Sequence, residues 1–112
     1  MLNGQALHAL GARGNGMLIG VLDSGFDGVD SSLAFAPLRT RGGILGTRDL
    51  VAHDGDVYAD HWHGRSVLSC MAAVLDSHLI GTAPDADYVL IRTEEVASEF
   101  PVEEDTWISG AE

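Results

Sequence analysis

The sequence is poor in cysteine and in basic residues, and it contains no long apolar run. Its 112 residues include a single cysteine, Cys70, which cannot form a disulfide within the chain. Six Lys and Arg residues stand against 17 Asp and Glu residues, so the formal net charge is −11. This charge argues against nucleic acid and against anionic membrane surfaces as partners. No stretch approaches the roughly 18 consecutive apolar residues of a membrane span, so we predict no membrane segment within this chain.

Short strand and helix patterns alternate along the chain. The predicted elements are a helix over 4–11, a strand over 17–22, a helical turn over 31–35, a strand over 47–51, a helix over 63–75, a strand over 88–92 and a helix over 105–112. Residues 39–46 are polar and glycine-rich, and we expect them to form a surface excursion. This order predicts the α/β class, with a mainly parallel sheet flanked by helices.

The predicted helix over 63–75 has the most regular pattern. Its apolar residues recur at the spacing of a buried helical stripe: Val67, Leu68, Met71, Ala72, Val74 and Leu75. We expect Cys70 to lie on the same buried side. Trp62 and Trp107 are predicted to be packing residues, and Asp105 is predicted to cap the last helix.

An acid and a histidine are the candidate catalytic residues. Asp23 ends the apolar stretch Leu-Ile-Gly-Val-Leu and is followed by Ser-Gly, which predicts a carboxylate at the carboxyl edge of the sheet. His63 begins the predicted central helix, where the helix dipole disfavours the imidazolium. An Asp that accepts a hydrogen bond from one ring nitrogen would orient such a histidine as a general base.

Three stretches, two of which contain these residues, together carry a family resemblance. Asp23-Ser-Gly, then His-Gly-Arg-Ser-Val-Leu-Ser-Cys-Met-Ala from His63, then Gly-Thr-Ala-Pro-Asp-Ala-Asp-Tyr-Val-Leu-Ile-Arg over 81–92, resemble the subtilisin-like serine peptidases. The stretch Thr-Trp-Ile-Ser-Gly-Ala-Glu over 106–112 is similar to the start of the next helix of that family. The Asp motif stands before the His motif, as in the family's chain order of Asp, His and Ser.

The resemblance implies a serine endopeptidase with Asp23 as the orienting acid and His63 as the general base, acting on peptide or protein substrates without a cofactor. The nucleophilic serine would lie in a Gly-Thr-Ser-x-Ala motif, which residues 1–112 lack. We therefore expect residues 1–112 to be the N-terminal portion of a catalytic domain, with a partial subtilisin-like fold truncated before the catalytic serine. We expect this portion to be inactive without the remainder of the domain. The resemblance also favours an extracellular, periplasmic or cell-surface location.

Other readings of the same residues remain open. Arg65 and Ser66 depart from the family's usual Thr and His after His-Gly, and Arg65 would bring a cation beside the site, so a catalytically dead interaction module is one alternative. A metallohydrolase is another, because His61-x-His63 has zinc-ligand spacing; its further ligands would come from His8, His53 or His78. Without such a metal, His61 is a loop neighbour. The segment from Asp23 to Ala34 does not fit a calcium loop, which requires Glu at its last position.

Overall fold

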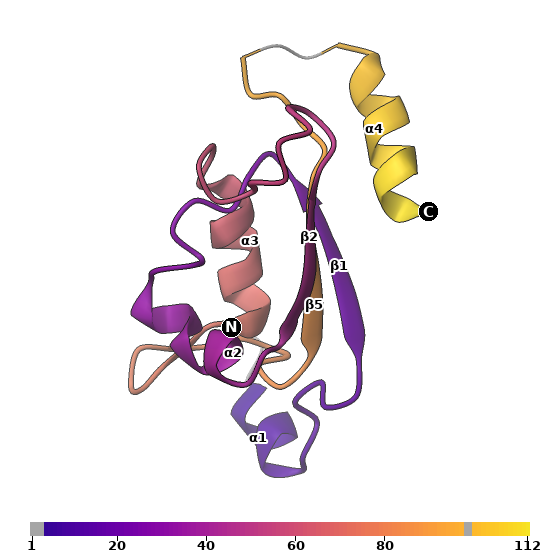
Figure 1. The fold of residues 1–112 in the computed structure, drawn as a ribbon. Helices are drawn as coiled ribbons and strands as arrows, with labels where there is room; N and C mark the ends of the chain where they lie inside the picture. The colour runs from indigo at the N-terminus through magenta and orange to yellow at the C-terminus, as the bar shows by residue number, and fades with distance from the viewer. Residues whose placement is uncertain (1–3, 98–99) are drawn as a thin grey trace.

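The computed structural model describes residues 4–97 and 100–112 (Figure 1). The elements are α1 (Gly4–Ala9), β1 (Leu18–Asp23), the 3₁₀ helix η1 (Leu33–Phe35), α2 (Ala36–Thr40), β2 (Ile44–Asp49), α3 (His63–Ala72), β3 (Val74–Leu75), β4 (Leu79–Ile80), β5 (Asp87–Arg92) and α4 (Val102–Ala111). None of the helices in the described ranges is long and apolar enough to span a bilayer.

A three-stranded parallel sheet is the centre of the fold. The strand order is β1-β5-β2, and both outer strands run parallel to β5. The register pairs Leu18 with Asp87 and Asp23 with Arg92, so β1 and β5 begin and end together. The predicted α/β class, with a mainly parallel sheet flanked by helices, is therefore confirmed.

The hydrophobic core lies between one face of the sheet and α3. Figure 1 shows α3 on this face, beginning at the edge where the three strands end. The core includes Val21 and Leu90 from the sheet and Leu68 from the helix, and all three are buried. Because strand residues alternate between faces, Asp23 points to the same side as Val21, toward the beginning of α3.

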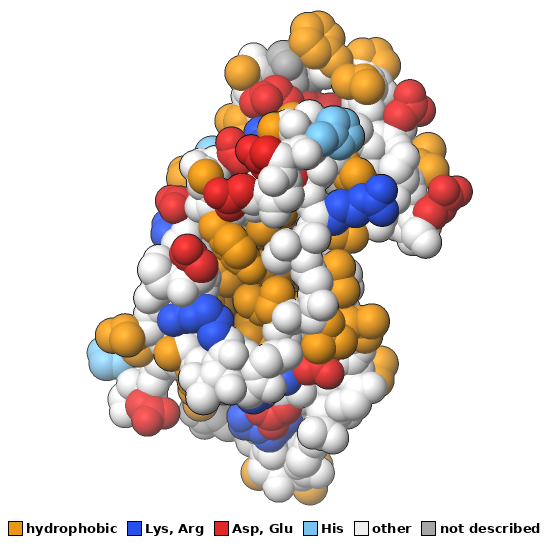
Figure 2. All heavy atoms as spheres, in the orientation of Figure 1, with side chains coloured by type: hydrophobic (Ala, Val, Ile, Leu, Met, Phe, Trp, Pro, Cys, Tyr) orange, Lys and Arg blue, Asp and Glu red, His pale blue; other side chains and the backbone are white. Residues whose placement is uncertain are grey.

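Helix α4 lies on the opposite side of the sheet, beside the end of β1 (Figure 1). A Cβ atom at Gly110 would come within 3.0–3.2 Å of side chains of Thr93, Leu22 and Ile91, so this glycine permits close contact with the sheet. Much of this side is nevertheless uncovered: Leu18 is 61% exposed and Figure 2 shows hydrophobic side chains below α4 on the side of β1.

Two predicted elements between β1 and the central helix differ from the structure. The second strand is Ile44–Asp49, not 47–51, and part of the expected excursion over 39–46 is therefore strand. Glycine at 42, 43 and 46 concealed it, because glycine usually indicates a loop. The helical turn predicted over 31–35 is also extended, because the chain continues from η1 into α2. Pro37 lies in the first turn of α2, where a missing N–H breaks no hydrogen bond of the helix.

The central helix is shorter than predicted. It ends at Ala72, and Val74 and Leu75 form the first strand of a small antiparallel hairpin. The last carbonyl groups of α3 explain this, since Cys70 and Met71 accept hydrogen bonds from the backbone N–H groups of residues 82 and 83. Long-range contacts of this kind leave no periodic signal in the sequence.

Several predictions of burial and capping are wrong. Trp62 is 52% exposed and Trp107 is 55% exposed, so neither is a packing residue. Cys70 is exposed as well, on the outer side of α3. Helix α4 begins at Val102 after Pro101, and Asp105 lies inside its first turn rather than at its N-cap. The carboxylate still benefits from the helix dipole at that position.

Candidate active site

Three strand ends bring charged side chains to one edge of the sheet. Asp23, Arg92 and Asp49 are the last residues of β1, β5 and β2, and Arg92 is in register with both acids. Each of the three is at most 5% exposed. Ligands of open α/β sheets bind beyond the carboxyl ends of the strands, so this edge is the candidate site.

The predicted Asp23–His63 pair is formed. Nδ1 of His63 lies 3.0 Å from both carboxylate oxygens of Asp23. A carboxylate only accepts hydrogen bonds, so Nδ1 carries a proton, and in the neutral ring Nε2 keeps a free lone pair. The Asp23 side chain is 8% exposed, whereas that of His63 is 54% exposed. The acid is thus enclosed and the ring reaches the surface, as orientation of a general base requires.

Two glycines allow the strand end and the helix start to come together. A Cβ atom at Gly64 would lie 2.5 Å from the Gly25 carbonyl oxygen and 2.9 Å from Cβ of Asp23. One at Gly25 would lie 2.6 Å from the backbone nitrogen of His61. The Gly64 N–H also donates to the Gly25 carbonyl, at 2.9 Å. Because these contacts leave no space for a side chain, both glycines allow Asp23 and His63 to come together.

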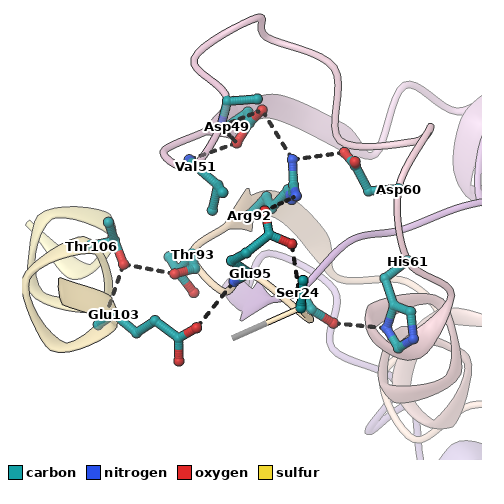
Figure 3. Close-up of polar contacts among 12 residues, drawn as sticks. Ser24, Asp49, Val51, Asp60, His61, Arg92, Thr93, Glu95, Glu103 and Thr106 are labelled. Carbon is teal, nitrogen blue, oxygen red and sulfur yellow. Dashed lines mark hydrogen bonds and ion pairs between the residues drawn. The ribbon is translucent and has the colours of Figure 1, made fainter. Parts of the chain in front are cut away.

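Ser24 and His61 extend the polar contacts of Asp23. The Ser24 N–H donates to Asp23 Oδ1 at 2.7 Å, and the Ser24 hydroxyl lies 3.1 Å from the same oxygen. The hydroxyl also lies 3.0 Å from Nδ1 of His61 (Figure 3). His61 is therefore more than the loop neighbour expected from sequence.

No serine hydroxyl of residues 4–97 and 100–112 forms a hydrogen bond with Nε2 of His63. The Ser24 hydroxyl contacts Asp23 and His61, and the Ser69 hydroxyl donates to the Ser66 carbonyl within α3. The described residues thus provide an acid and a base but no nucleophile bonded to the base.

A buried arginine forms ion pairs with three acids next to this pair. Nη1 of Arg92 lies 2.9 Å from Asp60 and 3.5 Å from Asp49, and Nη2 lies 3.6 Å from Glu95 (Figure 3). Burial alone would raise the pKa of Asp49. Hydrogen bonds from the backbone of Val51 and Ala52, together with the charge of Arg92, outweigh it, and the pKa is lowered. Charged and hydrogen-bonded in this way, Asp49 anchors β2 to the central strand.

Glu94 adds negative charge beside the Asp23–His63 pair. Its pKa is raised, first because neighbouring protein atoms reduce its hydration and then because Asp23 and Glu103 carry like charge. The charge that His63 carries when it is protonated acts in the opposite direction and lowers the pKa of Glu94. The surroundings of the ring are therefore acidic.

A cleft of about 430 Å³ opens beside His61. The residues that line it are Ala59, Asp60, His61, Arg92, Glu95, Val96 and Ala97. The cleft lies beyond the end of β5, so it belongs to the same edge of the sheet.

The residues of the alternative readings do not assemble around the pair. In the ranges 4–97 and 100–112, no three His, Cys, Asp or Glu side chains are grouped to hold a metal ion. His8 bonds to the Thr82 carbonyl and His78 to that of Asp76. The expected cation beside the site is also displaced: a Cβ at Gly28 would lie 2.5 Å from Nη1 of Arg65, so this guanidinium packs on the Gly28 segment.

Neither a family model nor a curated protein matches this chain. Sequence reasoning paired Asp23 with His63, and the two side chains are in contact, but it did not single out Ser24, Arg92 and Asp49. A signal for the last two was present, since each ends a strand of the parallel sheet. The strand predicted over 47–51 obscured it by placing Asp49 in a strand interior.

Proposed function

We propose that the Asp23–His63 pair is the acid and base of a serine endopeptidase, and that the nucleophilic serine is contributed by residues outside 1–112. The observation that carries this proposal is the geometry of His63. Nδ1 faces both oxygens of the buried Asp23 carboxylate at 3.0 Å, and the ring is 54% exposed. The sequence resemblance to the subtilisin-like peptidases supports the same assignment.

The chemistry follows from this arrangement. Nε2 takes the proton of the serine hydroxyl while the serine oxygen bonds to the carbonyl carbon of the peptide. Asp23 stabilises the imidazolium that forms. His63 then gives the proton to the leaving amine as the C–N bond breaks, which leaves an acyl-enzyme. Water hydrolyses the ester in a second cycle in which His63 again takes and returns one proton.

Beyond the peptide or protein substrate, the proposal requires one more partner, which is the remainder of the catalytic domain. That part would supply the serine and the donors that stabilise the tetrahedral oxyanion. The mechanism uses no cofactor. Residues 1–112 would provide the base, its orienting acid and one wall of the substrate cleft.

Labelling with a fluorophosphonate probe tests the proposal. The probe bonds to an activated serine oxygen with loss of fluoride. We expect no labelling of residues 1–112 alone and clear labelling of a chain extended beyond Glu112 along its coding sequence. In that longer chain, Asp23→Asn should lower peptide hydrolysis about 10⁴-fold and His63→Ala about 10⁶-fold.

His78→Ala is the matched control, because His78 is an exposed histidine that bonds to the backbone of Asp76 in the β3–β4 turn. This variant should hydrolyse peptides at the unmodified rate. Labelling of residues 1–112 alone would refute the missing nucleophile. A longer chain that remains unlabelled and inactive would instead favour the interaction module.

A further inference from the structure

The hydrogen bonds of Asp23 continue beyond the catalytic pair to a second histidine. From His63 they pass through Asp23 and the Ser24 hydroxyl to Nδ1 of His61, with separations of 3.0, 3.1 and 3.0 Å. The two imidazole rings lie nearly parallel, with centroids 6.4 Å apart and an interplanar angle of 21°. Each end of this chain is an imidazole ring.

We propose that His61, acting through Ser24, is a positioning residue that sets the proton affinity of the base His63. This inference deepens the proposed function because it concerns the same base. It is measured on the protonation of His63, however, and not on peptide cleavage.

The hydroxyl proton of Ser24 can point in two directions. It has one proton and two acceptors within reach, Asp23 Oδ1 at 3.1 Å and Nδ1 of neutral His61 at 3.0 Å. When His61 is protonated, its Nδ1–H donates to the Ser24 oxygen, so the hydroxyl proton turns to Asp23. When His61 is neutral with a lone pair on Nδ1, the hydroxyl can donate to it, and Asp23 loses one donor.

Both consequences of protonating His61 weaken proton binding at His63. The extra hydrogen bond to Asp23 satisfies the carboxylate and reduces its attraction for the imidazolium. The positive charge on His61 also repels a second positive charge at 6.4 Å. With an effective dielectric constant between about 40 and 80, this repulsion lowers the proton-binding constant of His63 about threefold to tenfold.

The other charges near His61 have partners of their own. Asp60 and Glu95, which line the cleft with His61, form ion pairs with Arg92. The backbone carbonyl of His61 accepts from the Asp27 N–H, which holds the loop in place. These ion pairs direct Asp60 and Glu95 toward Arg92, whereas the side-chain hydrogen bond of His61 is to Ser24.

An NMR titration of the imidazole nitrogens in the 112-residue chain tests the inference. Unmodified protein should show His61 and His63 titrating in two coupled steps. His61→Ala should convert the His63 curve to a single step, with a proton-binding constant about threefold to tenfold higher. Ser24→Ala removes the hydroxyl but keeps the charge on His61, so two steps should remain with a smaller separation.

His61→Asn separates charge from hydrogen bonding. Its amide reaches the position of Nδ1 and can bond to Ser24, but it never carries a charge, so the His63 curve should again be a single step. A two-step curve in this variant, or a His63 curve in folded His61→Ala that matches the unmodified protein, would overturn the inference. If His61→Ala does not fold, His61→Asn alone decides.

Asp23→Asn distinguishes this inference from the proposed function. Loss of the carboxylate should weaken proton binding at His63 whether or not His61 is coupled to it. An unchanged His63 curve in Asp23→Asn would therefore contradict the catalytic pair itself. An unchanged curve in the His61 variants alone would contradict only the role of His61. His78→Ala should leave the His63 curve unaltered, because that histidine lies in the β3–β4 turn.

Discussion

Replacing Arg92 with methionine should strongly destabilise the sheet, because it leaves Asp49 buried without its counter-ion. The side chain of Asp49 is fully buried, and that of Arg92 is 5% exposed. At an effective dielectric constant of about 20, charges 3.5 Å apart interact by about 5 kcal/mol. Asp60 and Glu95 are 37% and 47% exposed, so water replaces most of what they lose.

The expected loss is smaller than the full Coulomb energy. Asp49 keeps its backbone hydrogen bonds from Val51 and Ala52, at 2.8 and 3.1 Å, and methionine preserves most of the apolar stem of Arg92. Removing one partner of a buried ion pair typically costs 3–5 kcal/mol, and we expect about 3 kcal/mol here. Urea unfolding at pH 7, followed by circular dichroism, measures this difference.

Two further variants make the result specific. Asp49→Asn combined with Arg92→Met removes the stranded charge, and the Asn oxygen can still accept from the backbone, so about half of the lost stability should return. Arg48→Met is the matched control, because Arg48 is an exposed arginine of β2, and its replacement should change stability by less than about 0.5 kcal/mol. The reasoning is refuted if Arg92→Met changes the stability as little as Arg48→Met does, or if the double variant is no more stable than Arg92→Met.

Three other changes test separate parts of the site. Gly64→Ala should lower the free energy of unfolding in urea by about 1–3 kcal/mol, although alanine favours a helix, because its Cβ would lie 2.5 Å from the Gly25 carbonyl oxygen. The control is Ser66→Ala, at an exposed position of the same helix, which should leave the free energy of unfolding unchanged. Thr93→Val should raise stability by about 1 kcal/mol, since the fully buried Thr93 hydroxyl has no hydrogen-bond partner among the described residues. Stability should also fall below about pH 4. The pKa of Asp85 is lowered by a hydrogen bond from the Arg13 side chain, and that of Asp49 is lowered as described above, so the unfolded chain binds both protons more readily.

Each of these has a result that counts against it. A Gly64→Ala protein as stable as the original would mean that α3 is free to move away from β1. A loss of stability in Thr93→Val would mean that the hydroxyl has a partner. A urea midpoint that stays constant from pH 6 to about pH 3 would contradict the ionised state of the two aspartates.

The α/β class and the Asp23–His63 pair were predictable from the sequence because both depend on local patterns. Apolar stretches of strand length alternating with a helical stripe indicate a parallel sheet. An acid that ends a strand and a histidine that begins a helix are read directly from their neighbours. The sequence also shows a glycine, Gly64, directly after this histidine. It does not show that Gly25 and Asp23 fill the space beside that glycine.

The tertiary structure decided which residues surround that pair. Arg92 meets Asp49 because two strands share a register across the sheet, and that pairing joins segments more than forty residues apart. Helix α3 ends at Ala72 because residues 82 and 83 bond to its last carbonyls, which the apolar stripe continuing to Leu75 did not indicate. His61 reaches Asp23 only through Ser24, across the turn that Gly25 makes possible. Contacts of this kind depend on distance in space, which the spacing of residues along the chain does not encode.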